Sequence, residues 1–248
     1  MPKSLYILVM GEPTPMVKAE LGGYDRWFIF RMQDLPAQPF EAQSFDATRG
    51  ELPTQMPDAL IITGSPQSVY EPLPWLEPTR AYVREAIRAD VPILGVCFGH
   101  QLLAELLGGR VGPNPAGYVL GNILTQVTEE GRLDPLFDSL PPELSCNVTH
   151  GDRIVELPPG ASVLATAAQD PYHALRLRER VWSVQFHPEM REFHITAEIA
   201  SHSRWFHTYG VEKGLRPGEY LLNAIKSVRE EDDGVLVLRR WLELAAGE

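Results

Sequence analysis

The sequence has 248 residues, 44% of them hydrophobic and 22% charged, with a formal net charge of −11. This length and composition fit one large α/β domain, or one domain with an appendage, and the acidic balance argues against a nucleic-acid-binding face. Two cysteines cannot form a disulfide framework, and the sequence shows neither a signal-peptide pattern nor an apolar run long enough for a membrane span, so we expect a cytoplasmic protein that binds neither nucleic acid nor membrane.

The first part of the sequence alternates apolar runs with helical patterns. Residues 5–10, 40–46 and 58–63 predict strands, whereas residues 24–33 and 78–89 predict helices. Strands that alternate with helices indicate a doubly wound, mostly parallel sheet. Loops at 11–16 and 64–68 follow strand ends, and ligands bind such sheets at their carboxyl edge. Both loops should therefore face one crevice.

The next strand end carries a cysteine. Residues 91–94 predict a buried strand, and leucines at helical spacing follow from Leu102. Between them, Gly95, Cys97 and Gly99 have the spacing of a nucleophile elbow, with sulfur in place of the serine oxygen. Glycines permit the tight turn, and the N-terminus of the following helix favours a thiolate. The alternative is a structural cysteine buried after a core strand.

From residue 110 onward the pattern changes. Short runs at 119–127, 144–149, 153–157, 162–167, 172–178 and 181–186 predict a small antiparallel extension of the same domain, residues 1–190. Residues 191–248 predict a helical C-terminal extension packed on that domain. Its histidines lack a compact ligand spacing, so no metal site is expected, and residues 230–233 should form a solvated turn.

A second chemical feature follows the run at 181–186. Side chains two apart in a strand share a face, so His187 and Glu189 could point the same way beyond its end. Pro188 takes the chain out of the ladder there. Glu189 could then orient an imidazole that His187 presents to a thiol. The alternative is a strand-end histidine beside a solvated glutamate.

Taken together, these motifs resemble a known family. The segments at 97–101 and 187–189, in this order, resemble the signature of class I (triad) glutamine amidotransferases. The segment at 149–152, Thr-His-Gly-Asp, resembles the Ser-His-Gly-Asp segment of the amidotransferase domains of GMP synthases. The resemblance covers roughly residues 5–190 and implies a flavodoxin-like class I glutamine amidotransferase fold.

The resemblance also implies roles for individual residues. Cys97 would attack the side-chain amide of glutamine, giving a γ-glutamyl thioester and ammonia, while His187 moves the proton and Glu189 orients His187. The backbone N–H groups of Phe98 and Ser65 would form the oxyanion hole. The implied substrate-binding residues are Gly64, Gln101, His150, Gly151 and Asp152.

The fate of the ammonia stays open at this point. It could pass to a separate synthetase subunit, or the chain could act alone as a γ-glutamyl hydrolase or peptidase whose tail closes the site. A non-catalytic regulatory or binding module of the same fold is the third possibility. No cofactor is implied: the sequence shows no phosphate-binding loop. The residues after Met190 are too few for an ATP-using synthetase domain, so we do not expect GMP synthesis by this chain alone.

Overall fold

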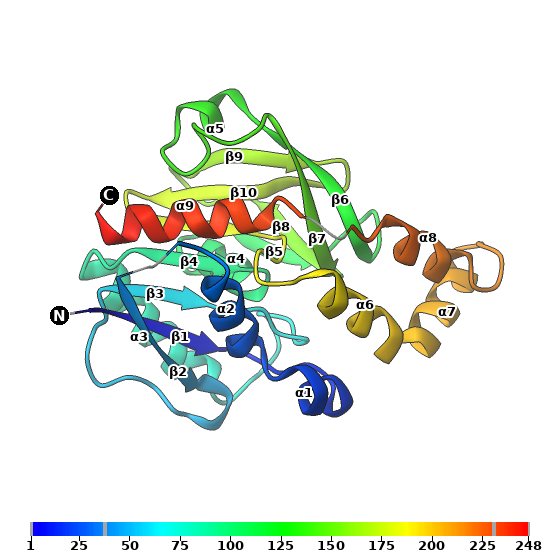
Figure 1. Ribbon diagram of the computed structural model, residues 1–248, viewed down its shortest axis with the longest axis horizontal. Coiled ribbons are helices and arrows are strands. Elements are labelled where there is room, and N and C mark those ends of the chain that lie inside the picture. The colour runs from blue at the N-terminus through cyan, green and yellow to red at the C-terminus, as the bar shows by residue number, and fades with distance from the viewer. Residues whose placement is uncertain (1, 37–38, 230–231, 248) are drawn as a thin grey trace.

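A nine-stranded mixed sheet organises the computed structural model, which describes residues 2–36, 39–229 and 232–247 (Figure 1). The strands follow the order β2-β1-β3-β4-β11-β10-β9-β6-β7 across it, and β5 pairs with β8 in a separate ribbon. The strands are β1 (Lys3–Val9), β2 (Phe40–Asp46), β3 (Ala59–Ile62), β4 (Ile93–Val96), β5 (Arg110–Pro113), β6 (Val119–Val127), β7 (Glu143–His150), β8 (Asp152–Glu156), β9 (Ser162–Ala167), β10 (Asp170–Arg178) and β11 (Val181–Val184).

Helices connect and cover these strands. The α-helices are α1 (Pro15–Leu21), α2 (Tyr24–Gln33), α3 (Leu76–Arg88), α4 (Phe98–Leu106), α5 (Glu129–Leu133), α6 (Glu192–Ser201), α7 (Ser203–Glu212), α8 (Glu219–Ser227) and α9 (Gly234–Ala246), and η1 (Ala47–Arg49) is a short 3-10 turn. Helix α1 was not predicted: part of its span lay in the loop expected at 11–16. Its proline occupies the first helical position, where the missing N–H costs nothing.

The strand directions confirm the predicted doubly wound, mostly parallel sheet with an antiparallel extension. Strands β2, β1, β3, β4 and β11 run parallel, and β10, β9, β6 and β7 continue the sheet with antiparallel neighbours. The run at 181–186 was grouped with the antiparallel part, and β11 indeed pairs antiparallel with β10, but on its other side it pairs parallel with β4. The periodicity of a strand reports burial and carries no information on direction.

Two buried layers hold the sheet between helices. On one face, Phe28 of α2 and Trp241 of α9 join a core cluster with Ile7 and Leu94. On the other face, helices α3 and α4 pack on Leu60 and Ile93 of the sheet. Helix α9 lies across the face of the sheet that is turned toward the viewer in Figure 1, whereas α6, α7 and α8 extend to one side. The alternate residues of the central strands thus face different helices, which is why β3 and β4 are buried on both sides.

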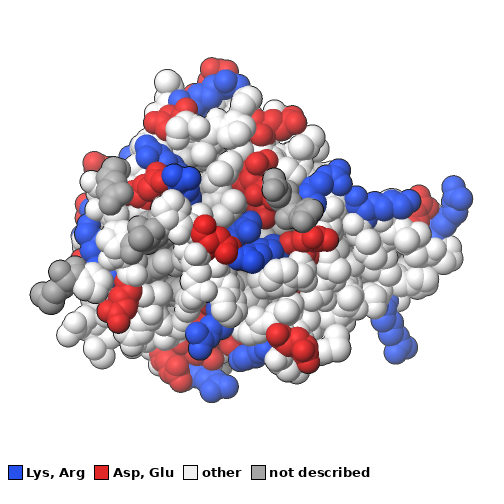
Figure 2. Space-filling view, in the orientation of Figure 1, with Lys and Arg blue, Asp and Glu red and all other residues white. Residues whose placement is uncertain are grey.

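The helices after Met190 contact the body of the molecule. Met190, Ile195 and Ile199 form a third buried cluster with Trp27 of α2. The division at residue 190 itself stays a prediction. Over the described ranges, no helix is long and apolar enough to cross a membrane, and no group of three acidic, histidine or cysteine side chains is arranged to hold a metal ion. Acidic and basic side chains are interspersed on the face shown in Figure 2.

The prediction of a solvated turn at 230–233 was wrong for residues 232 and 233. Residues 230 and 231 lie outside the described residues. Asp232 is only 7% exposed and forms an ion pair with Arg31 of α2. The Asp233 carboxylate accepts a hydrogen bond from the backbone N–H of Ser145 at 2.7 Å. A run of acidic residues is usually solvated, but here cationic and N–H partners far away in sequence compensate for the burial.

Candidate functional site

The predicted site residues come from neighbouring strand ends. Strands β4 and β11 are adjacent and in register, with Val96 opposite Val184, and the backbone N–H of Cys97 donates to Val184 O at 2.9 Å. Strand β3, which lies on the other side of β4, ends just before Gly64. Because parallel strands end at the same edge, the thiol, the His187 segment and the Gly64 loop meet there.

The turn at Cys97 has the geometry of an elbow. Cys97 adopts φ 52° and ψ −101°, a conformation rare for a residue with a side chain. A Cβ at Gly95 would lie 2.6 Å from Gly99 O, and one at Gly99 would lie 2.4 Å from Ile62 O. Neither position has room for a side chain. The two glycines therefore allow helix α4 to start directly above the sheet.

His187 and Glu189 form a buried pair beside the thiol. His187 Nδ1 lies 2.7 Å from Glu189 Oε1, and the two residues are 4% and 1% exposed. Burial alone would lower the pKa of His187, but the Glu189 carboxylate and the Cys97 sulfur raise it well above the ordinary value. The imidazole is thereby stabilised in its protonated form.

The free edge of the imidazole and the thiol complete this arrangement. Among the described residues, His187 Nε2 has no hydrogen-bond partner within bonding geometry, and Cys97 Sγ donates to Thr149 O at 3.9 Å. Cys97 is 6% exposed, and its sulfur forms part of a cavity wall. Cys146, the other cysteine, is fully buried in the core, where burial raises the pKa of its thiol far above the ordinary range. Only Cys97 is thus placed to react with a small molecule.

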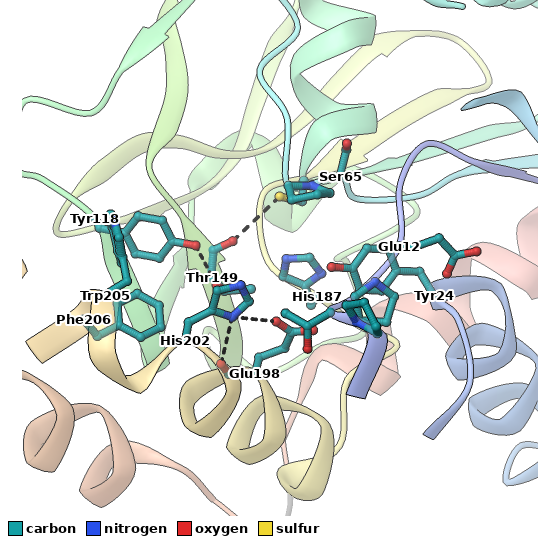
Figure 3. Close-up of a pocket in the computed structure, with 15 residues that line it drawn as sticks. Glu12, Tyr24, Ser65, Tyr118, Thr149, His187, Glu198, His202, Trp205 and Phe206 are labelled. Atoms are coloured by element: carbon teal, nitrogen blue, oxygen red, sulfur yellow. Dashed lines mark hydrogen bonds and ion pairs between the residues drawn. The ribbon is translucent and has the colours of Figure 1, made fainter. Parts of the chain in front are cut away.

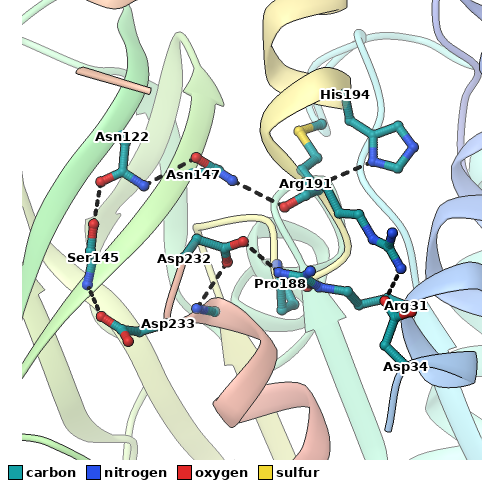
Figure 4. A network of polar contacts seen from close by, with 12 residues as sticks. Arg31, Asp34, Asn122, Ser145, Asn147, Pro188, Arg191, His194, Asp232 and Asp233 are labelled. Carbon is teal, nitrogen blue, oxygen red and sulfur yellow. Dashed lines mark hydrogen bonds and ion pairs between the residues drawn. The ribbon is translucent and has the colours of Figure 1, made fainter. Parts of the chain in front are cut away.

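Asn147 of β7 fixes the backbone around His187, and Figure 4 shows its side chain beside Asn122. The His187 N–H donates to Asn147 O at 2.8 Å, and the Asn147 side chain donates to Met190 O at 3.0 Å. A second asparagine, Asn122, donates to Asn147 Oδ1 at 3.1 Å. These bonds hold both ends of the segment that carries the imidazole and its carboxylate.

Arg31 supports the same segment from α2 (Figure 4). Its Nε donates to Pro188 O at 3.4 Å, and its Nη2 forms the ion pair with Asp232. Gly234, the first residue of α9, donates its N–H to Asp232 Oδ1 at 3.0 Å. Burial raises the pKa of Asp232 to about 6, and Arg31 acts in the opposite direction. The imidazole segment is therefore clamped between α2 and the start of α9.

The predicted oxyanion-hole residues lie on both sides of the thiol. Phe98 is the first residue of α4, so its N–H has no acceptor within the helix. A Cβ at Gly64 would lie 3.1 Å from His187 Cε1 and 3.5 Å from Cys97 Cβ. Ser65 follows directly and lines the same cavity as the thiol. The structure brings these groups together, and their role as donors stays a prediction.

Four of the five predicted substrate residues, Gln101, His150, Gly151 and Asp152, line a small cavity of about 250 Å³ together with Cys97, Tyr118, Thr149 and the 65–68 loop. Gly64 does not line it; it lies beside His187 and Cys97. The Gln101 amide donates to Asp152 O at 3.1 Å and to Gln185 Oε1 at 3.0 Å. His150 Nδ1 lies 2.9 Å from Asp152 O, and burial lowers the pKa of His150 to about 4. Gln101 and His150 thus shape this wall through protein contacts.

A second, large cavity of about 480 Å³ shares the wall at Cys97, Thr149 and Tyr118 (Figure 3). It is bounded by the 12–15 segment and by Ser65 and Pro66, which belong to the two loops that were expected to face one crevice. Further side chains in its walls were not predicted as site residues. They are Tyr24 of α2, Tyr118 just before β6, Glu198 of α6, His202 between α6 and α7, and Trp205 and Phe206 of α7. The concentration of aromatic residues in the tail was the available signal, but it gives no position relative to the thiol.

This combination of fold and geometry defines the chain as an α/β protein with a cysteine elbow at the carboxyl edge of a parallel sheet. The comparison with known families then makes the assignment specific. The family model described as "Glutamine amidotransferase class-I" matches residues 36–201. The chain belongs to the class I glutamine amidotransferase family of enzymes, as its motifs indicated.

Individual relatives agree with this assignment. The chain is 33% identical over 184 residues to a glutamine-hydrolyzing GMP synthase of Syntrophomonas wolfei, covering 73% of this chain and 34% of that relative. It is 32% identical over 224 residues to the corresponding protein of Aeropyrum pernix, covering 90% of this chain and 41% of the relative. The chain thus spans well under half the length of these relatives.

A solved structure shows the same fold. The crystal structure of a glutamine amidotransferase from Thermotoga maritima superimposes with a TM-score of 0.72 at 19% identity, covering 100% of both chains. At this level of identity the similarity concerns the fold alone. It includes the helical C-terminal part of the chain, because the match extends over the whole length.

Proposed function

We propose that this chain hydrolyses the side-chain amide of glutamine through Cys97, His187 and Glu189. The observation that supports this most directly is the buried His187–Glu189 pair, joined at 2.7 Å, beside a cysteine held at φ 52° on an elbow. A nucleophile, a base and a group that orients the base are the components that covalent amide hydrolysis requires. The family assignment agrees with this chemistry.

The proposed reaction has two steps. The Cys97 sulfur attacks the amide carbon, the carbon–nitrogen bond breaks, and the proton held by His187 passes to the leaving nitrogen. The carbonyl oxygen would accept hydrogen bonds from the N–H groups of Phe98 and Ser65. Water, activated by His187, then attacks the γ-glutamyl thioester, which releases glutamate and restores the thiol.

The proposed reaction releases ammonia together with glutamate. The matched relatives are named as GMP synthases, and this chain corresponds to about a third of the Syntrophomonas protein. We therefore propose a separate ammonia-accepting synthetase as partner. The reaction needs a reduced Cys97, which favours a reducing compartment such as the cytoplasm.

A second candidate is a γ-glutamyl hydrolase that acts alone. The large cavity beside Cys97 favours it, because the cavity has far more room than ammonia needs. Glu198 and Phe206 of the C-terminal tail form one wall of this cavity. They would close the site, as expected for a hydrolase that acts alone. Both candidates use the same cysteine and the same thioester.

A glutaminase assay with matched variants tests the shared chemistry. Glutamate release from glutamine is measured with and without added cell extract, because a partner can be needed for full turnover. Cys97→Ala should abolish release, and Cys146→Ala, which alters the buried core thiol, should retain it in the folded fraction. Glutamate release by Cys97→Ala equal to that of the parent would refute the proposal.

A further inference from the structure

The large cavity is out of proportion to ammonia as the leaving group. It has a volume of about 480 Å³, whereas a molecule of the size of water or ammonia occupies ~30 Å³ in a liquid. Its walls include side chains from the β1–α1 segment, α2, α6 and α7 (Figure 3). A space of this size can hold a substituent carried by the amide nitrogen.

The position of His187 indicates which part of a substrate would lie there. His187 lines the large cavity but not the small one, while Cys97 lines both. The group that protonates the leaving nitrogen must lie within hydrogen-bond reach of it. The leaving amine would therefore enter the large cavity, and the glutamyl part would occupy the small cavity beside Gln101 and Asp152.

The chemistry of the large cavity fits a cation. Four aromatic rings contribute to its walls, those of Tyr24, Tyr118, Trp205 and Phe206. Glu198 is only 5% exposed, and its Oε1 has no hydrogen-bond partner among the described residues. An unpaired buried carboxyl is costly, and aromatic faces attract cations. Burial raises the pKa of Glu198, and a bound ammonium group would lower it again.

Among the charged groups that line this cavity, Glu198 is the best placed to bind a cation. Glu12 Oε2 is also buried without a hydrogen-bond partner among the described residues, but Glu12 Oε1 is paired with Lys18 Nζ at 2.7 Å, which largely balances its charge. His202 Nδ1 lies 3.5 Å from Glu198 Oε2 and leaves Oε1 free. No lysine or arginine is found among the described residues that line the cavity. The cationic groups that act on Glu198 are therefore the imidazoles of His202, which faces Oε2, and His187, and a ligand ammonium group would bind at Oε1.

We propose that the enzyme hydrolyses γ-glutamyl amides of diamines or polyamines, with the distal ammonium of the leaving amine bound by Glu198 and the aromatic walls. This inference rests on the proposed function, because it uses the same thiol and thioester. The bond between the side-chain carbonyl carbon (Cδ) and the substituted nitrogen breaks as the Cys97 sulfur forms a bond to that same carbon. The nitrogen leaves as a primary amine with the proton from His187, and water releases glutamate.

The test compares glutamine with two conjugates of similar length, N5-(4-aminobutyl)glutamine and the uncharged N5-pentylglutamine. Glutamate release gives kcat/KM for each. The parent enzyme should prefer the aminobutyl conjugate over the pentyl conjugate at least about tenfold, as expected for a desolvated ammonium on a carboxylate and aromatic faces. Glu198→Gln should lower this ratio severalfold, to the preference that the aromatic walls alone provide, while Glu192→Gln, which alters an exposed residue of α6, should retain it.

The outcomes separate the inference from the proposed function. A parent enzyme that hydrolyses glutamine but shows no preference for the aminobutyl conjugate would overturn the inference and leave the function standing. An unchanged ratio in Glu198→Gln would also overturn it. If the parent hydrolyses none of the three compounds, with or without cell extract, both fail. The comparison of substrates on the parent enzyme remains decisive even where Glu198→Gln fails to fold.

Discussion

Glu189→Gln is the substitution that isolates the charge of the proposed catalytic row. The side chain keeps its shape, but the carboxylate that faces His187 Nδ1 at 2.7 Å is replaced by a neutral amide. A hydrogen bond to a charged group is worth about 1.5–3 kcal/mol, and Glu189 is only 1% exposed, so solvent cannot replace it. This corresponds to a loss of about tenfold to 150-fold in kcat/KM.

The pH profile distinguishes this role from a structural one. Because the Glu189 carboxylate raises the pKa of His187, the variant should move the His187 limb of the kcat/KM profile to lower pH. The assay is glutamate release from glutamine at a series of pH values, with thermal unfolding measured in parallel and Glu192→Gln as the exposed control. A Glu189→Gln enzyme with kcat/KM within twofold of the parent and an unshifted profile would refute the reasoning.

Three other substitutions test the surroundings. Arg31→Met leaves Asp232 buried without its cation, which should lower the unfolding free energy by about 3–5 kcal/mol and lower the Tm. Adding Asp232→Asn should recover part of this unfolding free energy. No recovery would contradict the stabilising role of the Arg31–Asp232 ion pair. Burial lowers the pKa of His100 to about 3, so its contribution to stability is complete above its unfolded pKa of ~6.5 and is lost as the pH falls toward 3. Between pH 7.5 and 4.5 the parent should therefore lose about 3 kcal/mol more unfolding free energy than His100→Gln by urea titration; equal losses would exclude this explanation. Gly64→Ala places a Cβ 3.1 Å from the imidazole of His187 and should reduce kcat about tenfold or more at little cost in Tm, whereas full activity would show that the loop tolerates a side chain.

The elbow was predictable because its determinants are local. The strand, the flanking Gly95 and Gly99 and the helical leucines all lie within a short stretch, and the steric requirement is visible in the sequence. His187 and Glu189 were predictable as a pair from their spacing. Their approach to Cys97 followed from the family resemblance, and the parallel register of β4 and β11 is its physical cause.

The remaining parts depend on contacts between distant segments. The sequence of the tail predicted helices, but an amphipathic pattern does not show which surface covers its apolar face. Glu198 and Trp205 were therefore missed as walls of the large cavity. Asp232 was assigned to a solvated turn because its partner, Arg31, lies 201 positions away in the sequence. Side chains of this kind acquire their role only when the sheet and its helices are assembled.

The claim on which this account depends is that Cys97 is the nucleophile toward a γ-glutamyl group. The most direct measurement is mass-spectrometric mapping of the adduct formed with a glutamine analogue whose amide is replaced by a chloromethyl ketone. We expect one adduct, on Cys97, that excess glutamine suppresses, with Cys146 unmodified in the core. An unmodified Cys97, or an adduct that glutamine does not suppress, would contradict the account.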